Sequence, residues 1–205
     1  MSKNIWQPLN MSSMTFNPAT RPDLMDRIAG MTVRDGEGHL HRMGQHYWQE
    51  PVKYSGGGGC WGSCNDYIKL LTSLLRRDGK ILKSQTIALM FQGHLKDPSY
   101  LTKVHQNPAL HALAGNIPQG TRLDHGLGGI LNVDEVSTTG RAPYTMQWSG
   151  LPNLFWWINP QDGVAGCYFG QLVPPGDGAS LKMFEKFEGA VYKFIGKSVK
   201  QETKL

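Results

Sequence analysis

The C-terminal third of this chain consists of short apolar or aromatic segments separated by turn residues, and this pattern constrains the fold more than any other feature. Four such segments occupy residues 126–133, 144–150, 154–158 and 164–173. The linker Asn159-Pro160-Gln161-Asp162-Gly163 is rich in turn residues, so the last two segments are expected to form an antiparallel hairpin. The pattern predicts an antiparallel sheet of about 3–4 strands.

The middle of the chain carries the clearest helical signal. Beyond Asn65, apolar residues recur at positions that share one face of a helix, and Asp78-Gly79 then ends the pattern. Either Ser63 or Asn65 could cap its first turn. The residues of the apolar face are Tyr67, Ile68, Leu70, Leu71, Leu74 and Leu75.

Shorter helical patterns lie elsewhere in the first 125 residues. A second helix is expected over about 84–92, opened by a capping serine, and a long connection rich in Pro, Asn and Gly follows it to about His125. The first third reads as loop with short helices near 5–9 and 22–28, and residues 32–53 are polar without a clear period. This part of the chain is therefore predicted to be a region of helices and loops.

A final amphipathic helix is expected after the sheet, because Pro174-Pro175-Gly176-Asp177-Gly178 breaks the strand pattern. Its inward residues are expected to be Leu181, Phe184, Phe187, Val191 and Ile195. Helices followed by an antiparallel sheet and a closing helix predict an α+β fold, an α/β sandwich. We expect one domain over 1–205, with the helical and loop region at 1–125 and the sheet plus C-terminal helix at 126–205.

Composition excludes several classes of function. The net charge is +5 and the pI about 9.1, but Lys and Arg are scattered, and the densest basic run, Lys193–Lys204, carries no interleaved pattern of aromatic residues for stacking. Neither nucleic-acid binding nor a membrane span is expected, since no stretch approaches about 18 apolar residues. Three cysteines and a start without an apolar leader predict an intracellular, cytoplasmic protein. The alternative is peroxisomal, because Thr203-Lys204-Leu205 is a loose relative of the Ser-Lys-Leu address.

Three segments, in this order, resemble a known family. Asn4–Met11 reads Asn-Ile-Trp-Gln-Pro-Leu-Asn-Met, and Tyr54–Tyr67 runs from a glycine-rich stretch into Ser63 and Asp66-Tyr67. Trp148-Ser149-Gly150 is followed by the aromatic strand 154–160. Together they resemble the β-lactamase-related serine hydrolases and esterases, which are similar to penicillin-binding proteins. The wording from Trp148 to Asn153 is most similar to the fungal branch of lovastatin-type acyltransferases, over the C-terminal half of that domain.

The resemblance implies an acyl-enzyme mechanism. In that family the serine of a Ser-x-x-Lys motif attacks a carbonyl, the lysine and the tyrosine of a Tyr-x-Asn motif handle the proton, and backbone amides bind the oxyanion. Trp148 and Gly150 match the strand that closes the pocket, Ser149 lies between them, and the amide of Leu151 matches an oxyanion donor. The aromatic residues Tyr144, Trp148 and Phe155 would suit a broad acyl-binding cleft, and His125 is a further candidate for its lining; ordinary sheet packing is the alternative reading.

The nucleophile motif of the family is missing from the sequence. None of the twelve serines has lysine three residues later, and the nearest match is Ser73 with Arg76, which cannot act as a base. No Tyr-x-Asn occurs, so no catalytic residue is identified. In the family both motifs would precede Met1. The sequence therefore predicts an acyltransferase- or esterase-type protein of secondary metabolism, acting on a small ester or thioester, without its nucleophile half.

Two further readings stay open beside that prediction. The first is a non-catalytic remnant or binding module that keeps half of the pocket. The second is isomerisation or cyclisation in the same cleft, for which no acid–base pair stands out. A sheet that lacks its N-terminal strands would leave an unpaired edge, so we expect a partner that supplies the N-terminal half, or a homodimer through that edge.

Other chemistry-bearing residues have ordinary explanations. His39, His41, Cys60 and Cys64 do not show a recognised zinc spacing, so neither a metal nor a cofactor is expected. Gly56–Gly59 is expected to be a tight turn, because the phosphate-binding Lys-Ser/Thr sequence does not follow it. Ser149 lacks the neighbours of a nucleophile elbow, and His125 could act as a base but is more readily a structural loop histidine. Adjacent Trp156 and Trp157 should point to opposite faces of their strand, one beneath the terminal helix.

Overall fold

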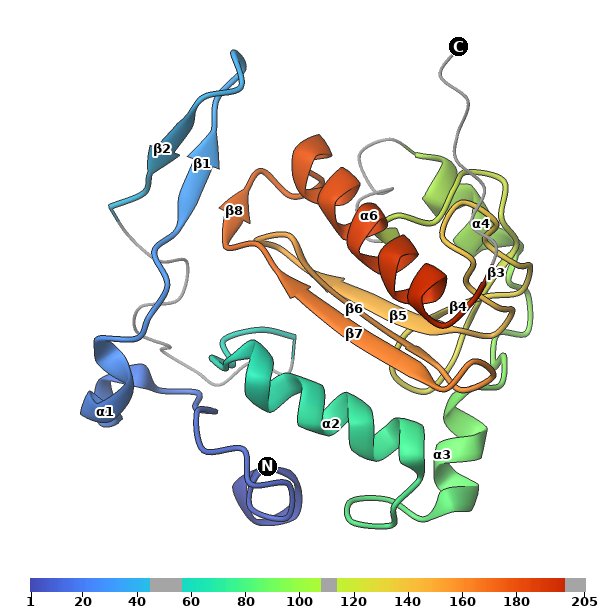
Figure 1. The fold of residues 1–205 in the computed structure, drawn as a ribbon, viewed down its shortest axis with the longest axis horizontal. Helices are drawn as coiled ribbons and strands as arrows, with labels where there is room; N and C mark the ends of the chain where they lie inside the picture. The colour runs from blue at the N-terminus through green and yellow to red at the C-terminus, as the bar shows by residue number, and fades with distance from the viewer. Residues whose placement is uncertain (45–56, 108–113, 198–205) are drawn as a thin grey trace.

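The computed structural model describes residues 1–44, 57–107 and 114–197. Its centre is a five-stranded antiparallel sheet in the order β3-β4-β5-β6-β7, with helix α2 on one face and helix α6 on the other (Figure 1). The elements are β3 Leu123–His125, β4 Ile130–Asn132, β5 Met146–Gly150, β6 Leu154–Asn159, β7 Val164–Phe169, α2 Cys64–Arg76 and α6 Gly178–Phe194. The predicted α+β sandwich is confirmed, and so is the antiparallel β6–β7 hairpin.

The sheet has five strands rather than the predicted 3–4, because β3 (Leu123–His125) forms in the stretch predicted to be a connection, just before the first expected strand. Residues 126–133 do not form one strand: the chain folds back where the Gly126 amide donates to the Gly129 carbonyl (2.9 Å), which separates β3 from β4. A side chain at 126 would lie 2.1 Å from the Met90 carbonyl, so glycine is required at that bend. Residues 164–173 also divide, because Gln171 adopts a left-handed φ of 47° and directs β8 (Leu172–Val173) out of the main sheet.

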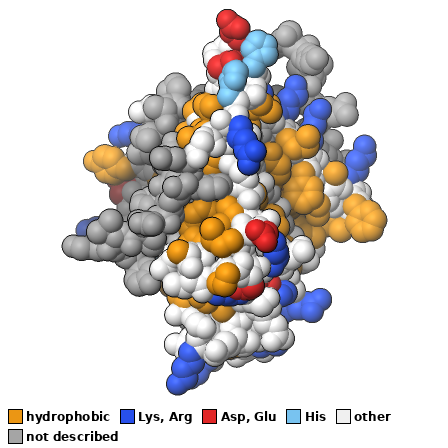
Figure 2. Space-filling view, turned by 90° about the vertical axis from the view of Figure 1, so that its left-hand side faces the viewer, with side chains coloured by type: hydrophobic (Ala, Val, Ile, Leu, Met, Phe, Trp, Pro, Cys, Tyr) orange, Lys and Arg blue, Asp and Glu red, His pale blue; other side chains and the backbone are white. Residues whose placement is uncertain are grey.

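Strand β8 joins a second, smaller sheet in the order β2-β1-β8. Strands β1 (Thr32–Arg34) and β2 (Leu40–Arg42) form an antiparallel ribbon, and Thr32 pairs in parallel with Leu172. The prediction of an unpatterned segment is wrong over these residues, because the Asp35 carboxylate accepts from the backbone amides that close the ribbon turn. The ribbon stands at the upper left of Figure 1, and its histidine and acidic side chains gather at the top of Figure 2. The rest of the predicted segment, 45–53, lies outside the described residues.

Helix α2 forms as the sequence predicts. The hydroxyl of Ser63 accepts a hydrogen bond from the Asp66 amide (3.2 Å), which identifies Ser63 as the N-cap, and Arg77 ends the helix with a left-handed φ of 52°. Leu71 and Leu74 are buried against the sheet and against Ile87 of α3 (Ser84–Met90). The N-cap of α3 is Lys83 without a side-chain hydrogen bond, so the predicted serine cap is wrong there.

The first half of the chain also contains short helical pieces. The segment after α3, predicted to be a connection, contains helix α4 (Ser99–Gln106). The remaining pieces are η1 Ser2–Trp6, η2 Pro18–Thr20 and α1 Pro22–Met25. No helix in the described ranges is long and apolar enough to cross a bilayer.

The side chains of β6 show which residues of the sheet face α2 and which face α6. Trp157 is fully buried beneath α6, where it meets Phe184 edge-on, while Trp156 faces α2 and lies 6.4 Å from Tyr67 between ring centroids. The predicted separation of the two tryptophans is confirmed. Of the residues expected to face inward on α6, Phe184 is fully buried and Leu181 and Val191 pack beside it, whereas Phe187 and Ile195 are about 40% exposed. Glu188 takes the inward place that the sequence assigned to apolar residues.

Candidate functional site

The predicted site residues lie at the end of β5 and in the turn that follows it. The register pairs Gly150 with Leu154, so Leu151, Pro152 and Asn153 form the connection between β5 and β6. A Cβ atom at position 150 would lie 3.4 Å from the Leu154 side chain, which is an ordinary van der Waals contact, so packing within the described residues does not by itself require glycine there. The amide of Leu151 donates to no acceptor among the described residues, and its side chain is 47% exposed.

This end of β5 projects beyond its neighbour β4. The ladder between the two strands joins Leu131 to Met146 and Ile130 to Gln147, and it therefore covers only the first two residues of β5. Trp148, Ser149 and Gly150 continue past it toward the turn. A projecting strand end of this kind can form one wall of a binding cleft, because its backbone lies at the border of the sheet.

Trp148 and His125 are brought together near the end of β5. Trp148 is 38% exposed, and the His125 ring meets it edge-on at 5.6 Å and 75°. His125 ends β3, whereas the sequence placed it at the end of the connection that precedes the first expected strand. Its Nδ1 donates to the Gly126 carbonyl (2.7 Å), so the lone pair of the neutral ring lies on Nε2. The two residues form a half-open aromatic surface.

Phe155 and Ser149 lie on the other side of the sheet. They are cross-strand partners, and Phe155 is 2% exposed and stacks on Phe184 of α6 at 4.8 Å. Trp148 pairs instead with Trp156, which faces α2. Because neighbouring residues of a strand point to opposite faces, the structure does not bring Phe155 or Ser149 to the face of the sheet that Trp148 occupies. Phe155 is therefore a core residue beneath α6.

Tyr144 is separate from the aromatic pair. It precedes β5, is 48% exposed and has a left-handed φ of 58°, with its amide donating to the Asn132 carbonyl (2.6 Å). Within the described residues, no ring contact joins Tyr144 to Trp148.

The buried side chain of Asn153 stabilises the turn between β5 and β6. Its φ of 56° is left-handed, which asparagine tolerates, and its side chain is 1% exposed. The amide group donates to the carbonyls of Leu172 and Pro174 (both 2.8 Å), and the amide oxygen accepts from the backbone amides of Gly176 (2.9 Å) and Asp177 (3.2 Å). Four hydrogen bonds thus attach the turn after Gly150 to the segment that leads into α6. The sequence marks Asn153 as a turn residue by the proline before it, but this signal does not reveal the four hydrogen bonds that its side chain forms.

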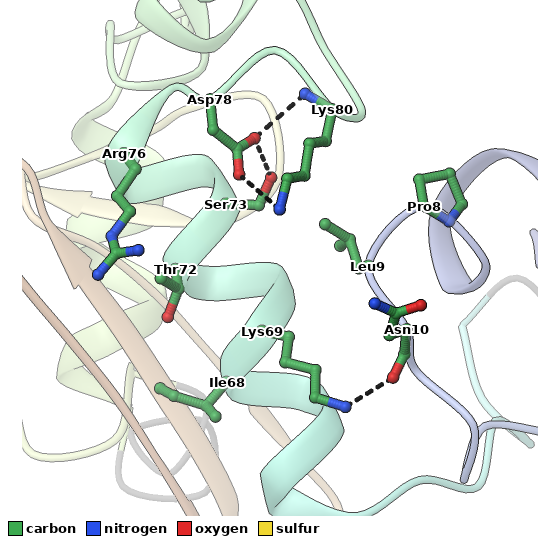
Figure 3. A pocket seen from close by; sticks show the side chains of 10 residues that line it. All are labelled: Pro8, Leu9, Asn10, Ile68, Lys69, Thr72, Ser73, Arg76, Asp78 and Lys80. Atoms are coloured by element: carbon green, nitrogen blue, oxygen red, sulfur yellow. Dashed lines mark hydrogen bonds and ion pairs between the residues drawn. The ribbon is translucent and has the colours of Figure 1, made fainter.

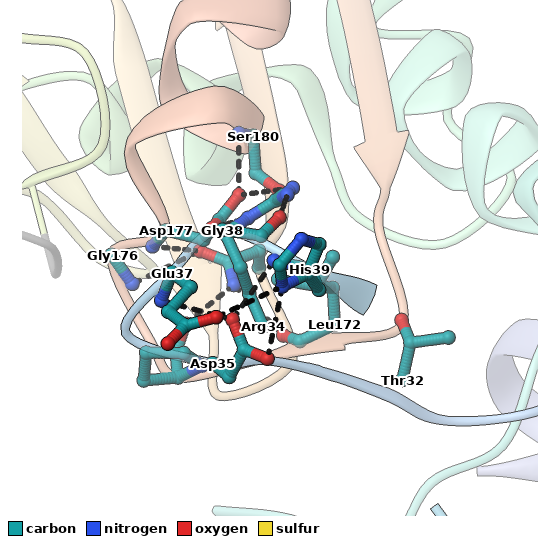
Figure 4. A network of polar contacts seen from close by, with 12 residues as sticks. Thr32, Arg34, Asp35, Glu37, Gly38, His39, Leu172, Gly176, Asp177 and Ser180 are labelled. Atoms are coloured by element: carbon teal, nitrogen blue, oxygen red, sulfur yellow. Dashed lines mark hydrogen bonds and ion pairs between the residues drawn. The ribbon is translucent and has the colours of Figure 1, made fainter. Parts of the chain in front are cut away.

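The same segment is anchored to the β1–β2 ribbon (Figure 4). The Asp177 carboxylate caps α6 by accepting from the Ser180 amide (2.8 Å) and pairs with the Arg34 guanidinium (2.5 Å). Burial alone would raise the pKa of Asp177, but the hydrogen bonds from Arg34 and Ser180 outweigh it and hold the pKa below its ordinary value. The turn, α6 and the ribbon are therefore linked by one polar network.

Gln147 anchors the other side of the motif. Its amide oxygen accepts from Arg141 (2.5 Å), which pairs with Glu188 of α6 through two contacts of 2.7 and 2.6 Å, and the side chains of Arg141 and Glu188 are both 0% exposed. The Gln147 amide also donates to the Ala114 carbonyl. Gln147 directly precedes Trp148, so this buried network fixes β5 on the N-terminal side of the motif. Asn153 fixes the turn on its C-terminal side.

Neither Ser73 nor a metal centre replaces the missing nucleophile in the described ranges. The Ser73 hydroxyl is buried within α2 and donates to Asp78 (2.7 Å). No group of three or more metal-ligating side chains is found there, and His41 pairs with Asp35 (2.6 Å). All three cysteines are free thiols. The first part of the predicted glycine-rich motif, Tyr54–Gly56, lies outside the described residues, as does the tail from 198 to 205.

Comparison with known proteins decides the family. The family described as Beta-lactamase matches residues 1–188. The chain belongs to this beta-lactamase family. It is 33% identical over 199 residues to the monacolin J acid methylbutanoyltransferase of Aspergillus terreus, covering 94% of this chain and 48% of the relative. It is 34% identical over 200 residues to the ML-236A carboxylate methylbutanoyltransferase of Penicillium citrinum, covering 95% and 48%.

The fold of a solved beta-lactamase-family relative agrees. A mutant of the simvastatin synthase of Aspergillus terreus superposes with a TM-score of 0.90 at 32% identity, covering 95% of this chain and 49% of that one. The resemblance to fungal acyltransferases of the beta-lactamase family is therefore confirmed. The chain spans about half the length of the curated relatives that it matches.

Proposed function

We propose that this chain forms the β5 wall of an acyltransferase of the beta-lactamase family that acts in secondary metabolism. One observation carries the proposal: the projecting Trp148–Gly150 end of β5 leads into the Leu151 amide, which has no acceptor among the described residues. An amide held in this way by the surrounding network is suited to bind an oxyanion, because it needs no reorganisation when charge develops. The residues 1–205 then make up a single partial domain.

The reaction would proceed in two balanced steps. A serine hydroxyl from a segment outside these 205 residues attacks the carbonyl of a small ester or thioester, and the alcohol or thiol leaves with the proton. A second small molecule then attacks the acyl-serine through its hydroxyl, and the serine is released. The Leu151 amide would bind the oxyanion in both steps. Trp148, supported by the edge of His125, would cover the apolar part of the acyl group.

Reconstitution tests this proposal. The 205-residue chain is produced alone and together with the unmatched half of the Aspergillus terreus methylbutanoyltransferase, and transfer from a synthetic acyl thioester to a hydroxyl acceptor is measured. We expect turnover from the combined halves and none from the chain alone. Leu151→Pro removes the amide and should reduce turnover by about 10²–10³-fold, whereas Leu151→Ala keeps the amide and should stay near the parent. Equal activity of the two variants would contradict the role of the amide.

A binding module without catalysis is the second candidate. It is favoured by the absence of Ser-x-x-Lys among the twelve serines. A fluorophosphonate probe separates the two functions, since labelling of a serine in the combined halves supports the enzyme, and ligand binding without labelling or turnover supports the module. The cytoplasmic location stays a prediction from the sequence.

A further inference from the structure

Two of the three cysteines, Cys64 and Cys167, meet where helix α2 begins. Cys64 is the first residue of α2, and Cys167 lies in β7, 103 residues later in the chain. The Cys167 thiol donates to the Cys64 carbonyl at 3.9 Å, so its sulfur lies against the first turn of the helix. The two thiols are also hydrogen-bond partners of each other. Neither thiol takes part in the acyl transfer proposed above.

Aromatic packing between α2 and the sheet keeps the two cysteines together. Tyr67 lies about one turn after Cys64 on the same side of α2. Its ring contacts the rings of Phe169 and Trp156, with centroids 5.6 and 6.4 Å away. Trp156 is the cross-strand partner of Cys167, and Phe169 follows Cys167 by two residues, on the same face of β7. The Tyr67 ring therefore packs on both neighbours of Cys167 and fixes the first turn of α2 beside it.

The thiol pair lies between α2 and the sheet and not on the outer face of the helix. Figure 3 shows that outer face, where Lys69, Thr72 and Arg76 line a hollow of about 210 Å³. Cys64 instead shares a side of α2 with Leu71, two turns later, which is buried against the sheet. Both cysteines nevertheless stay half-buried, so a molecule little larger than water can reach them.

Cys64 is the better nucleophile of the pair. Hydrogen bonding with Cys167 lowers the pKa of Cys64 below its ordinary value, although burial opposes this shift. A thiolate at a helix N-terminus is favoured further by the backbone N–H groups that the helix leaves unpaired. The same hydrogen bond, together with burial, raises the pKa of Cys167, which keeps its proton. Burial also raises the pKa of Tyr67, so the neighbouring phenol adds no negative charge that would oppose the thiolate.

From this arrangement we infer that Cys64 and Cys167 form a peroxide-sensitive modification site, which closes into a reversible disulfide between α2 and β7. The Cys64 thiolate attacks one oxygen of hydrogen peroxide, the O–O bond breaks, and the leaving hydroxide takes up a proton to give water and a sulfenic acid on Cys64. The Cys167 sulfur then attacks the Cys64 sulfur. The S–S bond forms, the S–O bond breaks, and the hydroxyl leaves as water with the Cys167 proton. Two thiols are thus oxidised, and one peroxide is reduced to two molecules of water.

Oxidation of the purified 205-residue chain with hydrogen peroxide tests this inference. Peptide mapping should find one intramolecular disulfide, between Cys64 and Cys167, which dithiothreitol reverses. The Tm should rise by at least about 5 °C on oxidation, because the crosslink spans 103 residues and restricts the unfolded chain. The matched variant Cys60→Ser removes the exposed thiol and should behave like the parent. A disulfide that includes Cys60, or oxidation of Cys64 without a crosslink, would overturn the inference.

Dimedone, which reacts with sulfenic acids, tests which cysteine is attacked first. In Cys167→Ser, made in the Cys60→Ser background, the sulfenic acid cannot be resolved, so dimedone should label Cys64 and the Tm should not rise with peroxide. In Cys64→Ser, made in the same background, Cys167 should stay unlabelled. Label on Cys167 and none on Cys64 would contradict the assignment. Peptide mapping of the unsubstituted chain decides the outcome if either variant fails to fold. Because no step involves β5, acyl transfer without the disulfide would refute this inference but not the proposed function.

Discussion

The two borders of the main sheet differ in how completely the chain itself holds them. At the β5 end, Asn153, Asp177 and the Arg141–Glu188 pair attach the motif strand to β8, α6 and the β1–β2 ribbon. At the β7 edge, apolar side chains from both covering helices stay half-buried, and Arg76 lacks a partner among the described residues. The chain thus preorganises the surface proposed to bind the acyl group, whereas the outer edge of β7 pairs with no other strand among the described residues.

The largest expected effect concerns the buried ion pair beneath β5. Glu188→Gln keeps the shape of the side chain but leaves the Arg141 charge uncompensated at 0% exposure, and we expect a loss of about 3–5 kcal/mol in the free energy of unfolding. Urea denaturation measures it. The double variant Arg141→Met with Glu188→Leu removes both charges and should be much closer to the parent. A single variant as stable as the parent would show that the network does not hold β5.

The next effect concerns the turn after Gly150. Asn153→Ala removes four hydrogen bonds and places an ordinary residue at a left-handed φ of 56°, which should cost roughly 2–4 kcal/mol. Asn153→Gly loses the same bonds without the backbone strain and should recover about 1 kcal/mol. Thermal unfolding of both variants checks this. Equal losses would assign the whole effect to the hydrogen bonds.

A smaller, pH-dependent effect concerns Asp177. Its pKa is lowered in the folded chain, so its interactions stabilise the fold above the unfolded value of about 3.9 and are lost as the pH falls through the lower folded value. Asp177→Asn keeps a good N-cap but cannot form the ion pair with Arg34. The parent should therefore exceed this variant in stability by about 1 kcal/mol at pH 7, and the difference should shrink below about pH 4. A difference that is constant with pH would contradict the ion pair.

The smallest effect is expected at the open edge. Arg76→Gln should change the stability of the isolated chain by less than about 0.5 kcal/mol, because no described residue pairs with the guanidinium. Denaturation of the isolated chain measures it, with Arg77→Gln as the neighbouring control. A clear loss of stability would show that Arg76 already has a structural role and would weaken the contrast between the two borders.

Parts of the fold were predictable because they depend on neighbours in the sequence. The apolar spacing and the Ser63 cap predicted α2, and the turn residues 159–163 predicted the β6–β7 hairpin. The opposite orientation of Trp156 and Trp157 follows from strand geometry alone. The motif around Trp148 was recognisable for the same reason, since its residues are contiguous.

Other features depended on pairing over long distances. The turn from Leu151 to Asn153 sets the register that places Phe155 opposite Ser149 and away from Trp148, so the aromatic residues do not line one cleft. Thr32 pairs with Leu172, which is far away in the sequence. Glu188 is buried because it forms an ion pair with Arg141, 47 residues earlier in the chain. A buried carboxylate is stable only with such a partner, and local pattern does not reveal the partner. The sequence by itself thus determined the family, the main helix and the hairpin, and the tertiary structure decided which side chains share a face and which sheet border stays open, because register and burial depend on contacts between distant segments.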